Sequence, residues 1–476
     1  MKSIAPTREV PAKSRASSGL HPRGIITVGE YTEAHWNPLT GRGGSITLTS
    51  ENVVKHRNRL MRSRVIAILV ALACCLCMPA TAARVTLTVA AFPDLDRSAK
   101  IAIAAWAHSH PDVEIKLTTR AYHDHHTAMT TAIATGANLP DVMAIDMDYL
   151  GKFTQVGGLE DLEAAPYDAR DLATRLAHFA IGSATGFGGK LRAMPADIGP
   201  GGLFYRTDLI ARAGLTEADL THDWASYIEA GRKLKSSTGI YLLASAIDLK
   251  DIVIRAGLRD GEGLYFDEAG TPQVESARFV LAFTLARAAR RAGIDARVAA
   301  WSSEWSEGFR RDRVATQMMG SWLAGHLKNW IAPSTAGLWR SAPLPGGAFA
   351  SWGGSYWAIP ARAEHKALAW EFIRTLSLDR TQQLEAFRRL DAFPALLAAQ
   401  QDDYLAQPIE FLGGQAARLQ WRTAAARIPA LHVDRYDQVA NDIVNAELDQ
   451  VLEHDKPIPQ ALADARLAIE RRARRY

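Results

Sequence analysis

Residues 188–215 read GGKLRAMPADIGPGGLFYRTDLIARAGL and carry more structural information than any other stretch of the chain. A glycine turn precedes a short apolar run that ends at Pro195, and Asp197 then leads into the glycine-rich segment 199–202. The aromatic run 203–205 is typical of a strand, and a helix is expected to open near Thr207 and Asp208. The stretch therefore predicts a strand and a helix reached through a glycine-rich crossing.

The length and composition indicate a two-lobed globular protein. A chain of 476 residues is too long for one ordinary hydrophobic core, and 48% hydrophobic with 22% charged residues is ordinary globular composition. Residues 1–82 hold 11 Lys and Arg against 4 Asp and Glu, so residues 83–476 hold 44 against 47. This nearly neutral body argues against nucleic acid as the main partner.

The basic excess lies in a leader. A short basic start at Met61 is followed by the uninterrupted apolar run 65–78, by Pro79, and by an A-x-A cleavage pattern at 80–82. This order predicts a secretory signal peptide over 61–82, since the apolar run is shorter than the roughly 20 residues that span a bilayer. Residues 1–60 are interpreted as a non-native upstream extension, with a disordered arm as the alternative.

The three cysteines, Cys74, Cys75 and Cys77, all lie inside the apolar run, so the exported chain would contain none. A lipid anchor at Cys74 or Cys75 is the alternative to release, but neither residue has the usual preceding pattern: Cys74 lacks Leu three positions before it, and Cys75 follows another cysteine. We expect a periplasmic protein without an anchor.

Strands and helices alternate along the first part of the exported chain. This alternation predicts an α/β fold with a largely parallel sheet, in which ligands lie beyond the carboxyl ends of the strands. The expected strands are 84–90, 113–117 and 141–145, and the expected helices are 98–108, 126–135 and 149–156.

The later chain is rich in helices. Helices are expected over 224–234, 275–292, 366–376 and 379–389, and strands over 314–319 and 355–359. We expect residues 83–197 and 346–395 to form an N-terminal lobe, and residues 198–345 and 396–476 to form a C-terminal lobe. A further crossing is expected at 391–394.

Nearly the whole exported chain, about 85–467, resembles the extracellular solute-binding proteins of ABC importers, in particular the carbohydrate-binding cluster that includes the maltose-binding type. The matching pieces are weak singly but occur in the order of the family. They are Ala134-Thr135-Gly136 with Pro140-Asp141-Val142, Gly157-Gly158-Leu159, Pro195-x-Asp197, Tyr205-x-x-Asp208-Leu209, Ala213-Gly214-Leu215, Trp224, Met318-x-Gly320-x-Trp322, 343–347, Gly353-Gly354 and Ala369-Trp370. One departure is the first strand, which ends Ala90-Ala91-Phe92 without the tryptophan that many members carry.

The resemblance implies a two-lobed periplasmic-binding-protein fold of type II, with a ligand cleft between lobes joined by hinge crossings. It also implies a monomer that captures a carbohydrate and delivers it to the permease subunits of an ABC transporter at the inner membrane, with no cofactor and no catalytic residue. In this family Trp322 corresponds to a tryptophan that stacks on a sugar ring; the alternative is a core tryptophan.

Sugar hydroxyls need hydrogen-bond partners and sugar C–H faces need flat apolar surfaces, so carboxylates and aromatic rings at strand ends and crossings are the candidates. Each acid has a structural alternative, namely a helix cap, a turn or a hinge hydrogen bond. Gly353 and Gly354 would let the backbone approach a ligand. The candidate ligand-binding residues are Asp94, Asp146, Asp148, Tyr149, Asp197, Trp322, Trp352, Gly353, Gly354 and Tyr356.

Two other functions are weighed. His123, His125 and His126 with Asp124 could bind zinc, but adjacent residues on one loop rarely converge on a metal, so a polar loop before a helix is favoured. A secreted glycoside-active enzyme could use Asp146 with Asp148, or Glu304 with Glu307, although the glutamates are spaced as on a solvated helix face. The same fold with a non-sugar solute is the third possibility.

Overall fold

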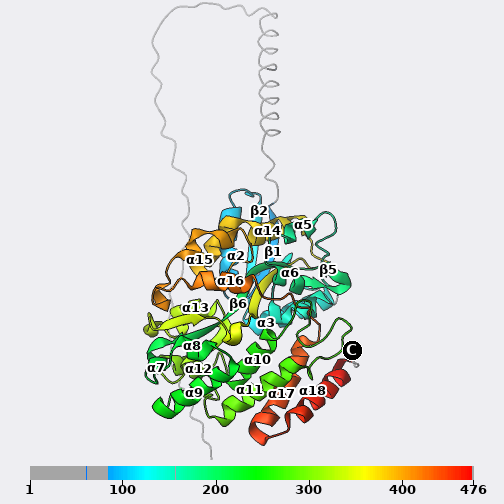
Figure 1. Cartoon of the computed structure of the whole chain (residues 1–476). Coiled ribbons are helices and arrows are strands. Elements are labelled where there is room, and N and C mark those ends of the chain that lie inside the picture. The colour runs from blue at the N-terminus through cyan, green and yellow to red at the C-terminus, as the bar shows by residue number, and fades with distance from the viewer. Residues whose placement is uncertain (1–60, 62–83, 156, 474–476) are drawn as a thin grey trace, which may run out of the picture. The chain divides into compact units, whose positions relative to one another are not determined.

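Strand β6, Met194–Arg206, passes through the quoted sequence and joins two halves of one sheet (Figure 1). Its first part pairs with β9, Ser351–Ala358, and its second part pairs with β7, Thr316–Gly320, and with β8, Trp339–Ala342. The predicted aromatic strand at 203–205 is confirmed, but it begins nine residues earlier, so the crossing itself is extended backbone within a strand.

The computed structural model describes residues 84–155 and 157–473, together with Met61. Residues 81–476 group as one unit, to which the following description refers. The predicted signal peptide, the stretch interpreted as an upstream extension and the three cysteines lie outside the described residues, apart from Met61.

The first half of the sheet is formed by β1, Val85–Ala91, β2, Val113–Thr119, and β3, Val142–Asp146. The order across the sheet is β2-β1-β3-β9-β6-β7, with β8 also paired to β6. The expected parallel pairing is confirmed for these three strands, since β1–β2 and β1–β3 are parallel, but the sheet as a whole is not largely parallel, because all its other strand pairs are antiparallel. The strands β9 and β6 run antiparallel to their neighbours, since each carries the chain between the two halves.

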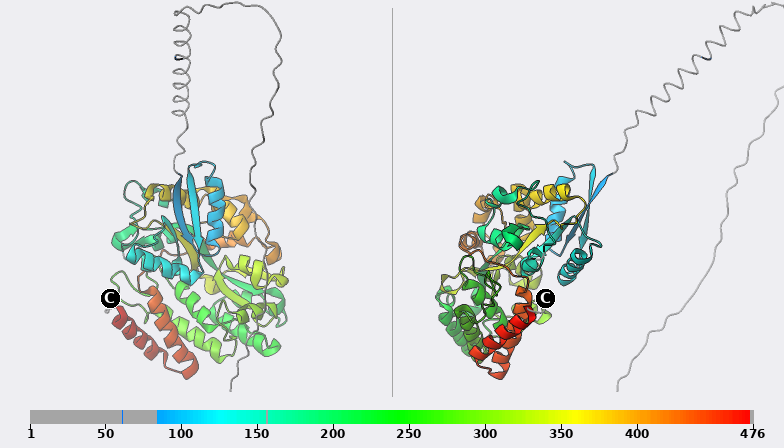
Figure 2. Two further views of the ribbon diagram at one scale, coloured as in Figure 1. Left: turned by 180° about the vertical axis from the view of Figure 1, so that it is seen from behind. Right: turned by 90° about the vertical axis from the view of Figure 1, so that its right-hand side faces the viewer.

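Helices cover the sheet at both ends (Figures 1 and 2). Beside the first half lie α2, Leu95–Trp106, α3, Tyr122–Thr135, α14, Lys366–Leu378, and α15, Arg380–Leu390. Beyond the second half lie α9, Trp224–Thr238, α10, Ala246–Ala256, α11, Ala277–Arg291, α17, Asp437–His454, and α18, Ile458–Ala473. Among the shorter helices are α4, Met147–Thr154, α5, Ala169–Ala173, α6, His178–Ala184, α7, Thr207–Ala211, α8, Glu217–Thr221, α12, Ser303–Arg310, α13, Leu323–His326, and α16, Ala417–Ala425.

Two groups of buried apolar side chains form the core. One extends over both halves of the sheet, from Leu87 and Val142 to Trp305, Trp339 and Trp421. The other fills the space among β6, α9, α10, α11, α17 and α18, and includes Leu203, Tyr227, Phe279, Phe283 and Leu448. Burial of apolar surface on this scale is the main force that holds the helices to the sheet.

Arg206 ends β6 and is 1% exposed. Its guanidinium donates from Nε and Nη2 to both carboxylate oxygens of Asp208 at 2.8 Å, from Nη2 to Asp312 at 2.7 Å, and from Nη1 to Phe309 O at 3.2 Å. The planar fork of arginine matches this set, which a lysine ammonium cannot reproduce. The network connects the end of β6 with α7 and with the turn between α12 and β7.

We expect Arg206→Lys to lower the free energy of unfolding by about 1–3 kcal/mol, because charge-assisted hydrogen bonds inside the protein are lost. Urea denaturation followed by circular dichroism measures the change. The matched control is Arg212→Lys, which alters an arginine that is 51% exposed beside the same two aspartates and should change stability by less than about 1 kcal/mol. Equal losses in the two variants would contradict the structural role of Arg206.

Candidate functional site

Asp146 and Asp148 lie where β3 passes into α4. Asp146 is the N-cap of α4, and its carboxylate accepts a hydrogen bond of 2.9 Å from the backbone N–H of Asp148. The backbone N–H of Asp146 donates to His126 Nε2 at 3.1 Å. Asp146 therefore has the capping role that the sequence left open, and its position is held from α3.

Burial shapes the electrostatics of this strand end. Burial, together with the charge of Asp148, raises the pKa of Asp146 to about 7, and the nearby hydroxyl of Tyr122 acts in the opposite direction. Burial also raises the pKa of Asp197 to about 6, with a further contribution from the charge of Asp94. The structure thus brings Asp146 within electrostatic range of Asp148 and of Asp197, which lies inside β6, and brings Asp197 within range of Asp94.

Contacts from the C-terminal half reach this region. Arg255 of α10, whose side chain is 12% exposed, donates to Asp148 at 3.1 Å. The side chain of Tyr149 lies near Gln438 of α17, and its hydroxyl is 2.9 Å from His123 Nδ1. His326 at the end of α13 is 3.9 Å from Asp94. Side chains that are more than 100 residues apart in sequence therefore meet between the two halves of the sheet.

We call the region in which side chains of the two halves of the sheet meet the junction. Trp322 lies there, after the end of β7, and is partly exposed. Its indole Nε1–H donates to the backbone oxygen of Trp352 at 2.8 Å, and its ring stacks on that of Trp301 with centroids 5.7 Å apart and planes at 24°. Gly353 has φ +74°, and a Cβ there would lie 3.1 Å from Trp322 Nε1, so glycine allows the indole to fit against the backbone.

Trp352 connects the aromatic and the acidic sides of the junction. It is partly exposed, and the guanidinium of Arg255 lies 5.8 Å from its ring centroid, within the range of a cation–π contact. Because Arg255 also binds Asp148, one cation joins a carboxylate from β3–α4 to an aromatic ring of β9. The predicted residues Asp94, Asp146, Asp148, Tyr149, Trp322, Trp352 and Gly353 thus share one region.

The remaining candidates lie within the crossing strands. Tyr356 is 1% exposed, so we leave its side chain out of the proposed site. Gly354 has φ +134°, and a Cβ there would lie 3.2 Å from Asp197 O, so its glycine serves the contact between β9 and β6. Asp197 accepts a hydrogen bond of 3.0 Å from Ser355 N, which is the hinge contact that the sequence offered as its alternative.

The three histidines at 123–126 lie in a helix, and their rings form hydrogen bonds with other protein groups. The expectation of a loop before a helix at 126 is wrong, because α3 begins at Tyr122 and includes all three histidines. His125 Nε2 is 2.9 Å from Ala144 O, and His126 Nδ1 is 2.8 Å from Tyr122 O. Burial lowers the pKa of His126 to about 3, so the ring is neutral and can accept from Asp146 N. Within the part of the chain that the structure describes, no three His, Cys, Asp or Glu side chains are grouped to hold a metal.

Glu307, which with Glu304 was considered as the acid and base of a glycosidase, forms ion pairs with neighbouring arginines. Glu307 accepts from Arg310 and Arg311 at 2.9 and 2.6 Å, and these hydrogen bonds lower its pKa. A general acid needs the opposite shift.

Sequence reasoning missed Tyr122, Arg255, Trp301, His326 and Gln438. Each lies inside a helix or a turn with no distinguishing local pattern. Only the left-handed backbone of Trp301, φ +70°, is unusual, and it is not visible in the sequence.

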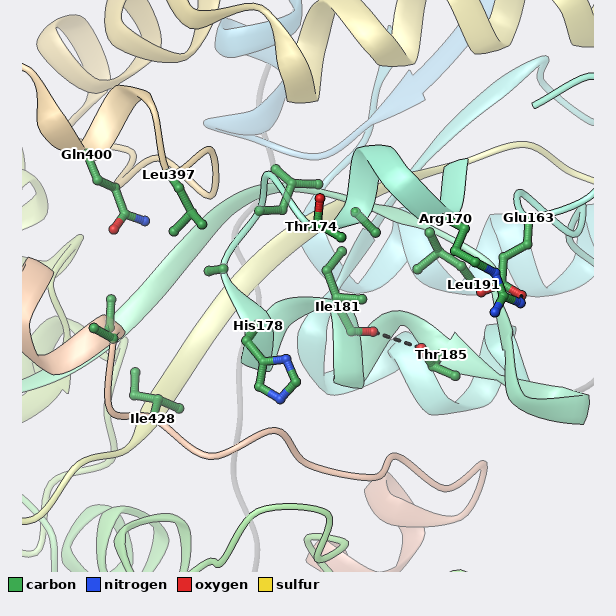
Figure 3. A pocket seen from close by; sticks show the side chains of 15 residues that line it. Glu163, Arg170, Thr174, His178, Ile181, Thr185, Leu191, Leu397, Gln400 and Ile428 are labelled. Carbon is green, nitrogen blue, oxygen red and sulfur yellow. Dashed lines mark hydrogen bonds and ion pairs between the residues drawn. The ribbon is translucent and has the colours of Figure 1, made fainter. Parts of the chain in front are cut away.

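Two cavities lie away from this region. The larger, of about 640 Å³, is lined by Leu176, His178, Ile181, Leu191, Leu397 and Ile428 among others (Figure 3), and the second, of about 580 Å³, lies beside Ile133, Lys152 and Arg362. Neither contains a predicted site residue.

We expect Asp146→Asn to become more stable relative to the original protein as the pH rises from about 4 to about 8. The carboxyl titrates at 3.8 when unperturbed and at about 7 in the folded protein, so the unfolded chain binds fewer protons and stability falls with pH across this window. Asparagine keeps the capping oxygen but has no charge to bury. Urea midpoints at pH 5 and pH 8 measure the difference.

Asp402→Asn is the control of opposite sign. The N–H of Tyr404, with Arg388 and Arg380, lowers the pKa of Asp402, so its charge stabilises the fold above about pH 4 and this contribution is lost as the pH falls through the folded pKa. The asparagine variant should therefore be less stable at pH 8, with the gap closing in acid. A pH-independent effect of Asp146→Asn would contradict its burial as a charge.

Comparison with known proteins agrees with this architecture. A lactose-binding protein of Rhizobium radiobacter is 26% identical over 76% of this chain and 86% of its own length. A solved extracellular solute-binding protein of family 1 superposes with a TM-score of 0.71 at 25% identity, over 81% of this chain and 99% of its own.

The ABC-transporter-associated binding protein of B. animalis subsp. lactis Bl-04, solved with β-1,6-galactobiose, superposes with a TM-score of 0.66 at 21% identity, over 81% of this chain and 96% of its own. The fold is thus the two-lobed type II binding-protein fold, and these relatives are binding proteins. Among the residues that the structure describes, no helix has the length and apolar character to cross a membrane. Residues 102–412 match the model of the bacterial extracellular solute-binding proteins, and the chain belongs to this family.

Proposed function

We propose that this protein binds a carbohydrate between its two lobes and delivers it to an ABC transporter permease. The observation that carries the proposal is the meeting of Asp94, which follows β1, and of the carboxylates at β3–α4 with Arg255 and Trp322 from the other half of the sheet, beside Trp352 of β9. The lobes, as proposed, are 83–197 with 346–395, and 198–345 with 396–476.

This arrangement supports sugar binding chemically. A sugar presents hydroxyl groups that lose water on binding, and each unpaired polar group costs about 1–3 kcal/mol. Asp94, Asp148 and Arg255 offer acceptors and donors for them, while Trp322 and Trp352 offer flat apolar surfaces for the C–H faces. The names of the two relatives, one a lactose-binding protein and one solved with β-1,6-galactobiose, favour the same class of ligand.

The proposed mechanism is a shift in population between open and closed lobes. A ligand that contacts both halves only when they are close stabilises the closed form by its differential affinity. The Asp148–Arg255 and Asp94–His326 contacts already connect the halves, so a sugar would replace contacts between protein groups with contacts to itself. The permease would then recognise the closed surfaces.

The compartment and the partners follow from the same proposal. We infer export through the signal peptide at 61–82 and residence in the periplasm without a lipid anchor, as a monomer that does not bind nucleic acid. The extracellular character of the family and the acidic excess of residues 83–476 support this inference.

We propose binding without catalysis. The raised pKa of Asp146 is a property that a general acid would also have, so turnover must be tested directly. Incubation with lactose, β-1,6-galactobiose and maltose should give stoichiometric binding and no products by chromatography. Product formation would favour the glycoside-active enzyme.

A thermal-shift screen tests the ligand class, because a ligand that binds only the folded state raises the melting temperature by mass action. The panel contains galactosides, glucosides, arabino-oligosaccharides, polyamines, phosphate esters and divalent metals. A rise with sugars only supports the proposal. A rise with polyamines or metals only would mean that the cargo is not a carbohydrate.

We expect Trp322→Ala to weaken the affinity for the sugar found in this screen by about tenfold or more, because a central stacking ring is removed. Trp322→Phe should keep part of the affinity. Isothermal titration measures both, and Trp224→Ala, at the start of α9 in the helical layer, is the control that should leave affinity unchanged. Full affinity in Trp322→Ala would remove this residue from the proposed site.

A further inference from the structure

Two exposed tryptophans lie beside Trp322. Trp301 is 52% exposed and Trp330 is 46% exposed, which makes them two of the most exposed large apolar side chains among the described residues. The ring of Trp301 stacks on that of Trp322 and on that of Trp330, with centroids 5.7 and 6.3 Å apart and planes at 24° and 26°. The three indoles form a row, which we call the tryptophan row, that leads from the partly exposed Trp322 to the protein surface.

The row is held rigidly. His326 contacts all three rings edge-on, and Trp330 Nε1–H donates to His326 Nδ1 at 2.9 Å. Arg310 donates to the backbone oxygens of Trp330 and Ile331 at 2.7 and 2.6 Å. A rigid ring loses little conformational entropy when a ligand stacks on it, so ordered tryptophans bind more strongly than mobile ones.

The backbone at both exposed rings is unusual. Trp301 has φ +70°, a conformation that bulky residues rarely adopt. Trp330 lies in a π-helical turn, Leu327–Ile331. Such departures cost free energy and cluster at functional sites, so their coincidence at the two exposed rings is a reason to assign the row a role.

Polar groups face the row from the other lobe. Because His326 Nδ1 accepts from Trp330, the ring carries its proton on Nε2, the atom that lies 3.9 Å from Asp94. Asp94 also pairs with Arg97 at 3.2 Å, and both side chains are 55% exposed. An aromatic surface opposite an exposed carboxylate and guanidinium has the two features that a sugar ring requires, an apolar face and hydrogen-bond partners.

We propose that Trp301 and Trp330, together with Asp94 and Arg97, form an outer sugar subsite, so that the ligand is an oligosaccharide of three or more rings. One or two rings bind at Trp322 and Trp352, and the following rings extend along the tryptophan row toward the surface. The proposal rests on the proposed carbohydrate function and adds chain length to it.

The test compares ligands of different length on the same variants. Titration calorimetry is performed with two series, lactose with its galactosyl-extended three- and four-ring homologues, and maltose with maltotriose and maltotetraose. The proteins are the original chain, Trp301→Ala, Trp330→Ala, Trp330→Phe, and Leu281→Ala as a control that truncates another exposed apolar side chain, on α11. Circular dichroism verifies that each variant is folded.

The original protein should bind the three- or four-ring member of one series more tightly than its two-ring member. Trp301→Ala and Trp330→Ala should reduce this gain by about three- to tenfold while two-ring affinity stays nearly constant. Trp330→Phe should restore part of the gain, and Leu281→Ala should have no effect.

The contrary outcomes separate the two proposals. If the original protein binds two-ring sugars and longer sugars gain nothing, or if the alanine variants weaken all lengths equally, the outer subsite is wrong and the carbohydrate function stands. If neither series binds to the original protein, the outer subsite is wrong for these sugars, and the screen described above then decides whether the carbohydrate function falls as well.

Discussion

The pairing of β6 along both of its edges is the constraint on which the rest of the molecule depends. Its first residues bond to β9 and its last residues bond to β7 and β8, so a single strand sets the relation between the two halves of the sheet. Trp322 follows β7 and Trp352 lies in β9, both neighbours of β6. The hydrogen bond from the indole of Trp322 to the backbone oxygen of Trp352 joins these two segments beside the crossing. The hydrogen bonds of Arg206 fix the far end of β6.

The junction contains both charged side chains and aromatic rings, and this combination suits a polar ligand. Asp94, Asp146 and Asp148 lie after β1 and at the end of β3, and Asp197 lies within β6; burial makes ionisation of Asp146 and Asp197 costly, which raises their pKa values. Arg255 offsets part of this cost by binding Asp148 beside Trp352. A solute with several hydroxyl groups would satisfy such carboxylates without bringing a charge of its own, which agrees with the neutral, hydroxyl-rich ligand that we propose.

Local patterns predicted most elements but not their partners. The strands near 84–90, 113–117 and 141–145 and the helices near 224–234 and 366–376 are confirmed within a few residues, because alternation and helical periodicity depend on close neighbours in sequence. The start of α3 was placed four residues too late, since Tyr122 is held in the helix by packing on Phe92 and Tyr149, which no local pattern contains. The directions of β9 and β6 likewise depend on how the chain returns between lobes.

The candidate site shows the same division. From residue types and their order alone came the family resemblance and the choice of Trp322 and of the acids near the strand ends as candidate ligand-binding residues, because these are properties of motifs. Only the tertiary structure decided that Tyr356 is buried, that Asp197 bonds to Ser355, and that Arg255, His326 and Trp301 join the acids and Trp322. The physical reason is that burial and pairing arise from segments more than a hundred residues apart, whose approach is set by the packing of the whole sheet and its helices and by no single stretch of chain.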